Sequence, residues 1–143
     1  MSSEDEVRRL IVELRLLEGT AETLQSRINL VNAMHAELSM AKKTLEGIEK
    51  EKPDASVLVP IGGGSYIKAK LADVEKVVYG VGAGISIEKP LEEAKRGVDE
   101  RISELERTRR ALEQQYSQVL RRIQENRERL QELISKQKAE EGK

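Results

Sequence analysis

The chain has 143 residues, of which 36% are charged and only 2% are aromatic, and it contains no cysteine, phenylalanine or tryptophan. A globular core depends on aromatic burial, so this composition argues against a compact globule and favours long helices that bury a narrow seam. The 25 basic and 26 acidic residues nearly cancel, which removes the electrostatic footprint of a nucleic-acid-binding protein.

The first predicted element is a coiled-coil helix over residues 1–51. Its apolar residues recur at steps of three and four, as in a heptad seam: Val7, Leu10, Leu14, Leu17, Ala21, Leu24, Ile28 and Val31. Strict heptad positions turn polar at His35 and Lys42. We expect the seam to drift there to a neighbouring stripe, which consists of Met34, Ala41 and Ile48. Pro53 cannot continue a helix and ends the element.

Residues 52–90 change from heptad spacing to strand-like patterns. The runs "VLVPI" and "KVVYGV" are rich in β-branched residues, and "SYIKAKL" and "ISIE" alternate, which are strand signals. Glycine permits the positive φ that tight hairpin turns demand. The glycines assigned to turns are Gly62, Gly63, Gly64, Gly82 and Gly84. The segment is therefore predicted to form two consecutive β-hairpins, joined near Ala72 and Asp73.

The glycines do not fit a nucleotide-binding loop. A Walker-type loop needs G-x-x-x-x-G-K-[ST] between a strand and a helix, and no Gly-Lys-Ser/Thr follows here. The G-x-G-x-G run that begins at Gly80 lacks both the third-glycine spacing and the helix of a dinucleotide fingerprint. Flexible linkers lack β-branched alternation, so a linker does not fit either. We expect no nucleotide or other cofactor.

Two isolated hairpins would expose apolar strands along open edges. An isolated hairpin is marginal in water, and open edges pair with other chains. We therefore predict an oligomerisation module whose sheets are completed by neighbouring subunits and close into barrels. The residues assigned to it are Val57, Leu58, Val59, Ile61, Tyr66, Ile67, Ala69, Leu71, Val77, Val78, Tyr79, Val81, Ile85 and Ile87.

A second coiled-coil helix is predicted over residues 91–143, directly after Pro90, a residue that suits the first turn of a helix. Arg109 and Asn126 interrupt its seam, whose apolar members are Leu91, Val98, Ile102, Leu105, Leu112, Tyr116, Val119, Ile123, Leu130 and Leu133. If the hairpins reverse the chain, residues whose numbers sum to about 140 face each other, as antiparallel seams require. Any two heptad series align in some register, so the match supports an intramolecular pair without proving one.

These elements together define the expected fold. It is mostly α with a small β module: a long antiparallel two-helix coiled coil, joined by two consecutive β-hairpins that assemble into an inter-subunit β-barrel.

The segments "VPIGGGSYIKAKL" and "VGAGISIEKP", set between two heptad helices, resemble the α class of archaeal-type prefoldin subunits over essentially the whole chain. The resemblance implies a hexamer of two α-class and four β-class subunits, with a β-barrel base and six coiled-coil tentacles. It also implies ATP-independent capture of unfolded proteins and their delivery to a group II chaperonin.

If the hairpins form the base, both chain ends lie at the tip of a tentacle. The predicted client-binding residues there are Val7, Leu10, Ile11, Leu14, Leu130, Leu133 and Ile134. Ile11 and Ile134 fall outside the strict seam, so the tip holds more apolar surface than the helix pair can bury. Unfolded clients share exposed hydrophobic surface but no sequence, so such a surface suits them. Ordinary seam packing is the alternative role for the other five residues.

No residue pattern predicts catalysis. His35 is the only histidine and cysteine is absent, so we expect no metal site. No nucleophile, base and orienting group stand at a recognisable spacing, so we expect no enzyme. Tyr116 is predicted to pack in the seam. Arginine clusters such as Arg121-Arg122 are predicted to lie on solvated helix faces and to form i,i+4 ion pairs.

The chain is expected to be cytoplasmic and to have no membrane partner. Its first residues are polar and acidic, unlike a signal peptide, and no apolar run approaches the ~18 residues of a membrane span. Two function classes remain: a chaperone subunit, or a passive coiled-coil scaffold or tether that oligomerises through its hairpins.

Overall fold

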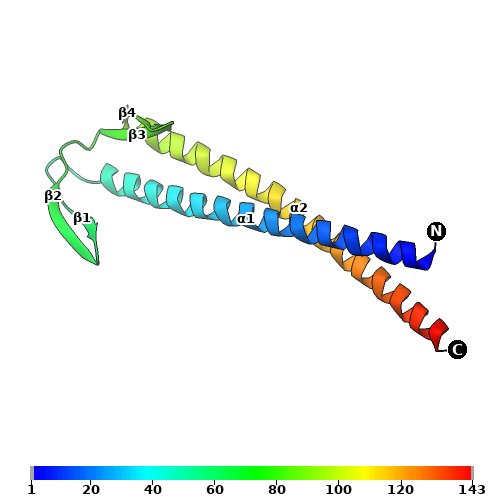
Figure 1. The fold of residues 1–143 in the computed structure, drawn as a ribbon. Helices are drawn as coiled ribbons and strands as arrows, with labels where there is room; N and C mark the ends of the chain where they lie inside the picture. The colour runs from blue at the N-terminus through cyan, green and yellow to red at the C-terminus, as the bar shows by residue number, and fades with distance from the viewer. Residues whose placement is uncertain (1, 143) are drawn as a thin grey trace. The chain divides into compact units, whose positions relative to one another are not determined.

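The computed structural model describes residues 2–142. The elements, in chain order, are α1 (Ser3–Glu49), β1 (Ser56–Gly62), β2 (Ser65–Lys70), β3 (Lys76–Gly82), β4 (Ile85–Pro90) and α2 (Leu91–Glu141) (Figure 1). Two long helices flanking two antiparallel β-hairpins confirm the predicted fold of the chain, while assembly of the hairpins into a barrel between subunits stays a prediction. The chain divides into two compact units, each containing parts of both helices: the terminal unit runs up to Ala33 and resumes at Glu106, and the hairpin unit runs from Met34 to Leu105.

Local chemistry sets where the helices begin and end. The amide of Asp5 donates to the Ser2 hydroxyl at 3.2 Å, and acidic residues fill the first turn of α1, where they favour the positive end of the helix dipole. α1 ends shortly before Pro53. Pro90 is the last residue of β4, and α2 begins at Leu91, the residue at which the second helix was predicted to begin; Pro90 therefore precedes the first helical turn. The backbone amide of Leu91, the first residue of α2, donates a hydrogen bond to the Glu75 carbonyl at 2.7 Å.

The core of the terminal unit is a seam between α1 and α2. Leu17, Ala21 and Ile123 form a buried cluster, against which partly buried side chains pack: Leu14, Tyr116 and Val119. The buried seam also includes Leu10, Leu24, Ile28, Val31 and Leu133. These contacts have the predicted antiparallel register and confirm the packing role expected for Tyr116.

In the hairpin unit the helix seam keeps its strict heptad positions. Leu38, Leu91 and Val98 are buried as predicted, and Ala94 is fully buried although the sequence pattern did not single it out. Met34 is 40% exposed while His35 beside it is half-buried. The expected drift was therefore wrong at Met34, because a heptad seam keeps facing its partner even where the residue is polar. Ala41 and Ile48, the other two members of the expected stripe, are half-buried, as are the polar heptad residues His35 and Lys42.

The hairpins form two separate two-stranded antiparallel sheets, β1 with β2 and β3 with β4. Val59 pairs with Ile67 in the first sheet, and Tyr79 pairs with Ile87 in the second. Gly63 and Gly64 have φ values of 57° and 75°, as the two central residues of a primed hairpin turn require. In the second turn Ala83 adopts φ 53°, a conformation that a side chain disfavours. Gly63, Gly64 and Gly84 thus lie in the turns as predicted, whereas Gly62 and Gly82, which also have positive φ, are the last residues of β1 and β3.

Candidate functional site

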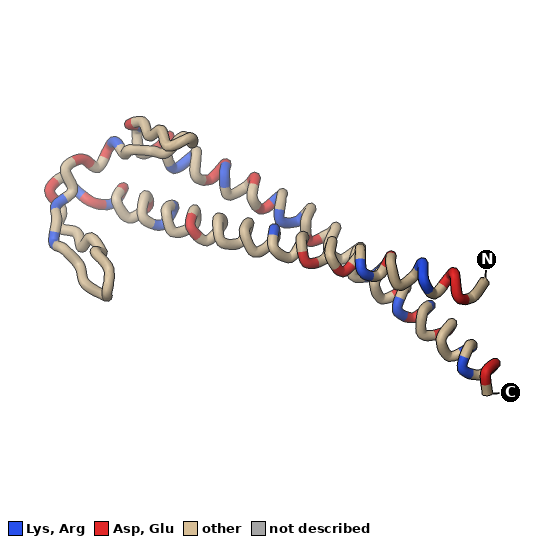
Figure 2. Tube along the Cα trace, in the orientation of Figure 1, with Lys and Arg blue, Asp and Glu red and all other residues tan. Residues whose placement is uncertain are grey.

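The two hairpins present apolar side chains on folded strands. Residues 55–67 and 77–87 contain no charged residue, and Figure 2 shows these strands mostly in tan. Exposure reaches 62% at Leu58 and 73% at Val78. The other exposed members of the predicted assembly set are Val59, Ile61, Tyr66, Ile67, Val81, Ile85 and Ile87. Because both sheets have only two strands, their edges are free to pair with further strands.

Five members of the assembly set are half-buried within the chain itself: Val57, Ala69, Leu71, Val77 and Tyr79. Of these, Tyr79 contacts α2. A Cβ atom at Gly97 would lie 2.8 Å from the Tyr79 hydroxyl oxygen and 3.2 Å from its Cζ, so any larger residue there would require the ring to shift. The Lys89 ammonium lies 5.1 Å from the ring centroid, within cation–π range. Tyr79 therefore anchors the second hairpin to α2, a contact that the strand pattern did not predict.

Gly97 was missed by sequence reasoning. The available signal was a glycine inside a heptad helix, where it costs about 1 kcal/mol relative to alanine. A glycine inside a helix, despite this loss of helix stability, often leaves room for close packing.

The predicted client-binding residues gather where the start of α1 meets the end of α2 in the terminal unit. Leu10 and Leu133 are buried, at 5% and 4% exposure, and Ile134 is 39% exposed. The remaining members are half-buried: Val7, Ile11, Leu14 and Leu130. Arg129 donates to Glu6 at 3.1 Å and so holds the two helix ends together. Most of this apolar surface is therefore sealed while the helices are paired.

Asn126 is a weak point in that seam. Its side-chain amide nitrogen is buried and has no hydrogen-bond partner within the described residues. A buried donor left without a partner costs about 1–3 kcal/mol. The sequence placed Asn126 opposite Leu14, which offers no acceptor in its side chain. The polar seam position therefore lowers the stability of the helix pair beside the predicted client-binding residues.

Sequence reasoning missed two exposed apolar side chains on the same stretch of α1. Val12 is 57% exposed and Leu16 is 68% exposed, more than any member of the predicted client-binding set. The signal was present in the run Leu10-Ile11-Val12, because three consecutive helical residues cannot all face one seam.

Ion pairs in the terminal unit join the two helices. Arg122 pairs with Glu13 at 2.9 Å, and Arg127 pairs with Glu18 at 3.1 Å. The expectation of i,i+4 pairs within one helix was wrong for Arg122, because flanking positions of an antiparallel pair lie closer to the partner helix. Arg129 bonds both across the pair and to Glu132 on its own helix.

In the hairpin unit two lysines bridge the helices. Lys95 lies 2.6 Å from Glu49, and Lys42 lies 2.9 Å from Asp99. The hydrogen bond from Lys95 lowers the pKa of Glu49, and the same contact raises the pKa of Lys95. The hydrogen bond to Asp99 raises the pKa of Lys42. All four side chains are solvent-accessible, so each pair adds little to stability.

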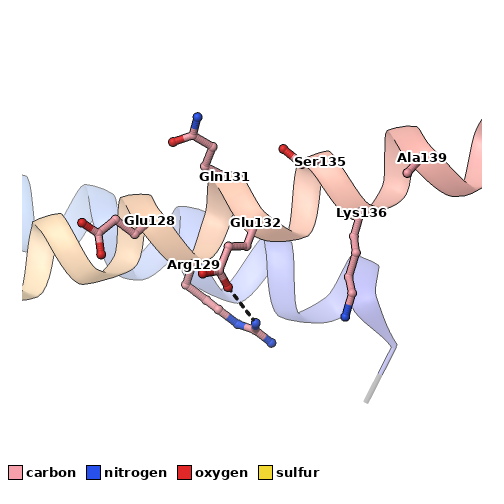
Figure 3. Close-up of a pocket in the computed structure, with 7 residues that line it drawn as sticks. All are labelled: Glu128, Arg129, Gln131, Glu132, Ser135, Lys136 and Ala139. Atoms are coloured by element: carbon pink, nitrogen blue, oxygen red, sulfur yellow. Dashed lines mark hydrogen bonds and ion pairs between the residues drawn. The ribbon is translucent and has the colours of Figure 1, made fainter.

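A concavity of about 810 Å³ lies on α2 near its C-terminal end (Figure 3). Its lining comes from one helix and is polar except for Ala139: Glu128, Arg129, Gln131, Glu132, Ser135 and Lys136. Arg129 bonds to Glu132 at 3.3 Å, so its charge is compensated. The surface offers no convergent apolar walls for a small molecule.

Within residues 2–142 we find no group of three side chains placed to hold a metal ion. No helix in that range has the length and apolarity to cross a bilayer.

Comparison with known proteins identifies relatives that align with most of this chain. Residues 17–136 match the prefoldin subunit family. The chain is 31% identical to prefoldin subunit alpha of Pyrococcus horikoshii, with 92% of this chain and 90% of that protein aligned. It is 34% identical to the corresponding protein of Methanopyrus kandleri, over 78% of this chain and 71% of that protein. Among solved structures, filamentous PFD from Methanocaldococcus jannaschii matches with a TM-score of 0.66 and 29% identity, covering 79% of this chain and 93% of that one.

Proposed function

Because this chain belongs to the prefoldin family, in its α class, we propose that it acts as the subunit of an ATP-independent chaperone that captures unfolded polypeptides. Members of this family are non-enzymatic chaperone subunits that assemble with other prefoldin subunits. The observation that carries the proposal is that one chain has two kinds of apolar surface. The apolar side chains of the hairpin strands are mostly exposed, whereas those at the helix ends are mostly buried between the helices.

The hairpins are the assembly surface in this proposal. Their strands hold exposed apolar side chains such as Leu58 and Val78, and their outer edges pair with no further strand among the residues that the structure describes. Strands from neighbouring subunits would complete the two sheets into β-barrels, which removes the edges and buries those side chains. Two copies of this chain would combine with four β-class subunits, as in the hexamer that the family resemblance implies.

The helix ends in the terminal unit are the client-binding surface. Clients present apolar segments without a common sequence, so they need apolar partners on an adaptable arm. Leu10 and Leu133 would become available when the helices separate, and Asn126 makes that separation easier. Captured clients would pass to a group II chaperonin in the cytoplasm.

The test assembles the chain with a β-class partner and measures aggregation of a chemically denatured client after dilution without ATP. The variant Ile11→Gln/Ile134→Gln reduces the apolar surface at the helix ends. We expect the wild-type assembly to suppress aggregation and this variant to lose most of that effect. The matched control is Leu120→Gln, which changes a 44% exposed leucine of the terminal unit outside the predicted set.

Three outcomes separate the alternatives. Loss of suppression in the Ile11/Ile134 variant alone supports capture at the helix ends, provided that its assembled mass is unchanged. Full activity in that variant would overturn the client-binding assignment. So would full activity in a chain shortened at both ends, through Leu14 at the N-terminus and from Asn126 onward at the C-terminus. A wild-type assembly that never suppresses aggregation would favour the passive tether.

A further inference from the structure

A groove of about 690 Å³ runs along one flank of the helix pair in the terminal unit. Its floor combines residues of α1 with one of α2: Leu16, Gly19, Thr20, Thr23 and Val119. Two glutamines of α2 border it on the other side. None of the seven predicted client-binding residues lines this groove.

The floor is apolar although it contains two threonines. The Thr20 hydroxyl donates to the Leu16 carbonyl at 3.0 Å, and the Thr23 hydroxyl donates to the Gly19 carbonyl at 3.1 Å. Both hydroxyls are thus satisfied by their own helix, which leaves the threonine methyl groups to the groove. Leu16 is 68% exposed, and nothing lies within 4 Å of the position that a Cβ at Gly19 would occupy.

An arginine lines the groove toward each end, Arg15 and Arg27. Neither has an ion-pair partner among residues 2–142, whereas Arg122 and Arg127 of the same unit both pair with glutamates. Twelve residues of helix separate the two arginines, which corresponds to about 18 Å. The groove is thus an apolar floor between two arginines that form no ion pair within residues 2–142.

We propose that this groove binds an extended apolar segment flanked by carboxylates. A chain in extended conformation covers about 18 Å with about six residues, so an acidic residue at each end would reach one arginine. This inference rests on the proposed function and deepens it by naming a class of client segment. Unlike the helix ends, the groove is open while the helices are paired, so it offers clients a first contact before the seam separates.

The test uses the chain assembled with its β-class partner and two fluorescein-labelled peptides. Both peptides carry the same central run of four apolar residues, flanked by glutamates in one and by lysines in the other. Fluorescence anisotropy at low salt should show at least about fivefold tighter binding of the glutamate peptide, since charge pairs at an exposed site contribute up to about 1 kcal/mol each. The variant Arg15→Gln/Arg27→Gln should abolish the preference.

A Cβ at Gly19 meets no atom within 4 Å, so Gly19→Gln can place its side chain in the groove. Gly47→Gln is the matched control, because a Cβ at that helical glycine is equally unhindered. Gly19→Gln should lose peptide binding while Gly47→Gln keeps it. Equal binding of the two peptides, or unchanged binding in Gly19→Gln, would overturn the proposal.

Two further outcomes are informative. A change of assembled mass in Gly19→Gln would assign the groove to a second copy of the chain and also overturn the proposal. Aggregation suppression that persists in Gly19→Gln, but fails in the Ile11/Ile134 variant, would reject the groove and leave the proposed function intact.

Discussion

The hairpins and the helix ends of the terminal unit hold similar apolar side chains in opposite states. On the hairpins, Ile67 is 54% exposed on a folded strand, while Leu10 at the helix end is 5% exposed in a closed seam. Permanent exposure on a rigid edge suits a lasting partner, because the strand needs no rearrangement before it pairs. An apolar surface that is exposed only when the helices separate suits a transient partner, because the seam can close again after the partner is released. Four predictions test this contrast, from the largest effect to the smallest.

The first prediction breaks the permanent surface. Ile67→Lys places a charge on the face where Ile67 pairs with Val59. Burying an unpaired lysine costs several kcal/mol, so assembly should weaken more than about 100-fold. Native mass measurement with a β-class partner checks this. Lys68→Gln, the next residue on the opposite face, should assemble normally, and an intact complex of Ile67→Lys would remove the hairpin from the assembly surface.

The second prediction closes the conditional surface. Asn126→Leu replaces the unpartnered amide with an apolar side chain and should stabilise the helix pair by about 2 kcal/mol. Thermal unfolding by circular dichroism measures the gain, and client aggregation should be suppressed less because the seam opens more rarely. The control is Asn32→Leu, at an exposed asparagine of α1. Greater stability with undiminished capture would show that clients do not need the seam to open.

The third prediction compares two helical glycines. Gly97→Ala forces a Cβ to within 2.8 Å of the Tyr79 hydroxyl and should destabilise the hairpin unit by about 1 kcal/mol after the helix gain is subtracted. Gly47→Ala meets no atom and should stabilise α1 by up to about 1 kcal/mol. Thermal unfolding measures whether each substitution lowers or raises the stability of the protein. Tyr79→Phe should partly rescue Gly97→Ala, and equal effects at the two glycines would contradict the Tyr79 anchor.

The fourth prediction concerns pH and has the smallest effect, because the groups are exposed. The lowered pKa of Glu49 means that its pair with Lys95 stabilises the folded state above the ordinary carboxyl value of 4.5 and loses that effect as pH falls. The raised pKa of Lys95 means that the effect is present below 10.5 and is lost as pH rises through the raised value. The difference in melting temperature between wild type and Glu49→Gln should therefore shrink at both extremes. A constant difference would exclude this ion pair as its source.

Much of the fold could be predicted because it depends on spacing along the chain. The heptad steps from Leu10 to Val31 define one helix face, and the glycines at 62–64 define a turn without reference to any other residue. The antiparallel register followed from matching the two seams. The roles of the hairpin and helix-end residues stay predictions, because they depend on chains that the molecule meets.

The sequence by itself determined the two helices and the two hairpins, because periodicity and turn chemistry are local properties. It supported the antiparallel register of the two seams without proving it. Only the tertiary structure decided that Tyr79 packs on Gly97, that Arg122 reaches Glu13, and that the side-chain amide nitrogen of Asn126 has no hydrogen-bond partner among residues 2–142. Each of these depends on the distance between atoms far apart in the chain. The spacing of residues in the sequence predicts on which face of a helix or strand a side chain lies. Whether that side chain is buried, bonded or exposed depends on the residues of other elements that pack against it.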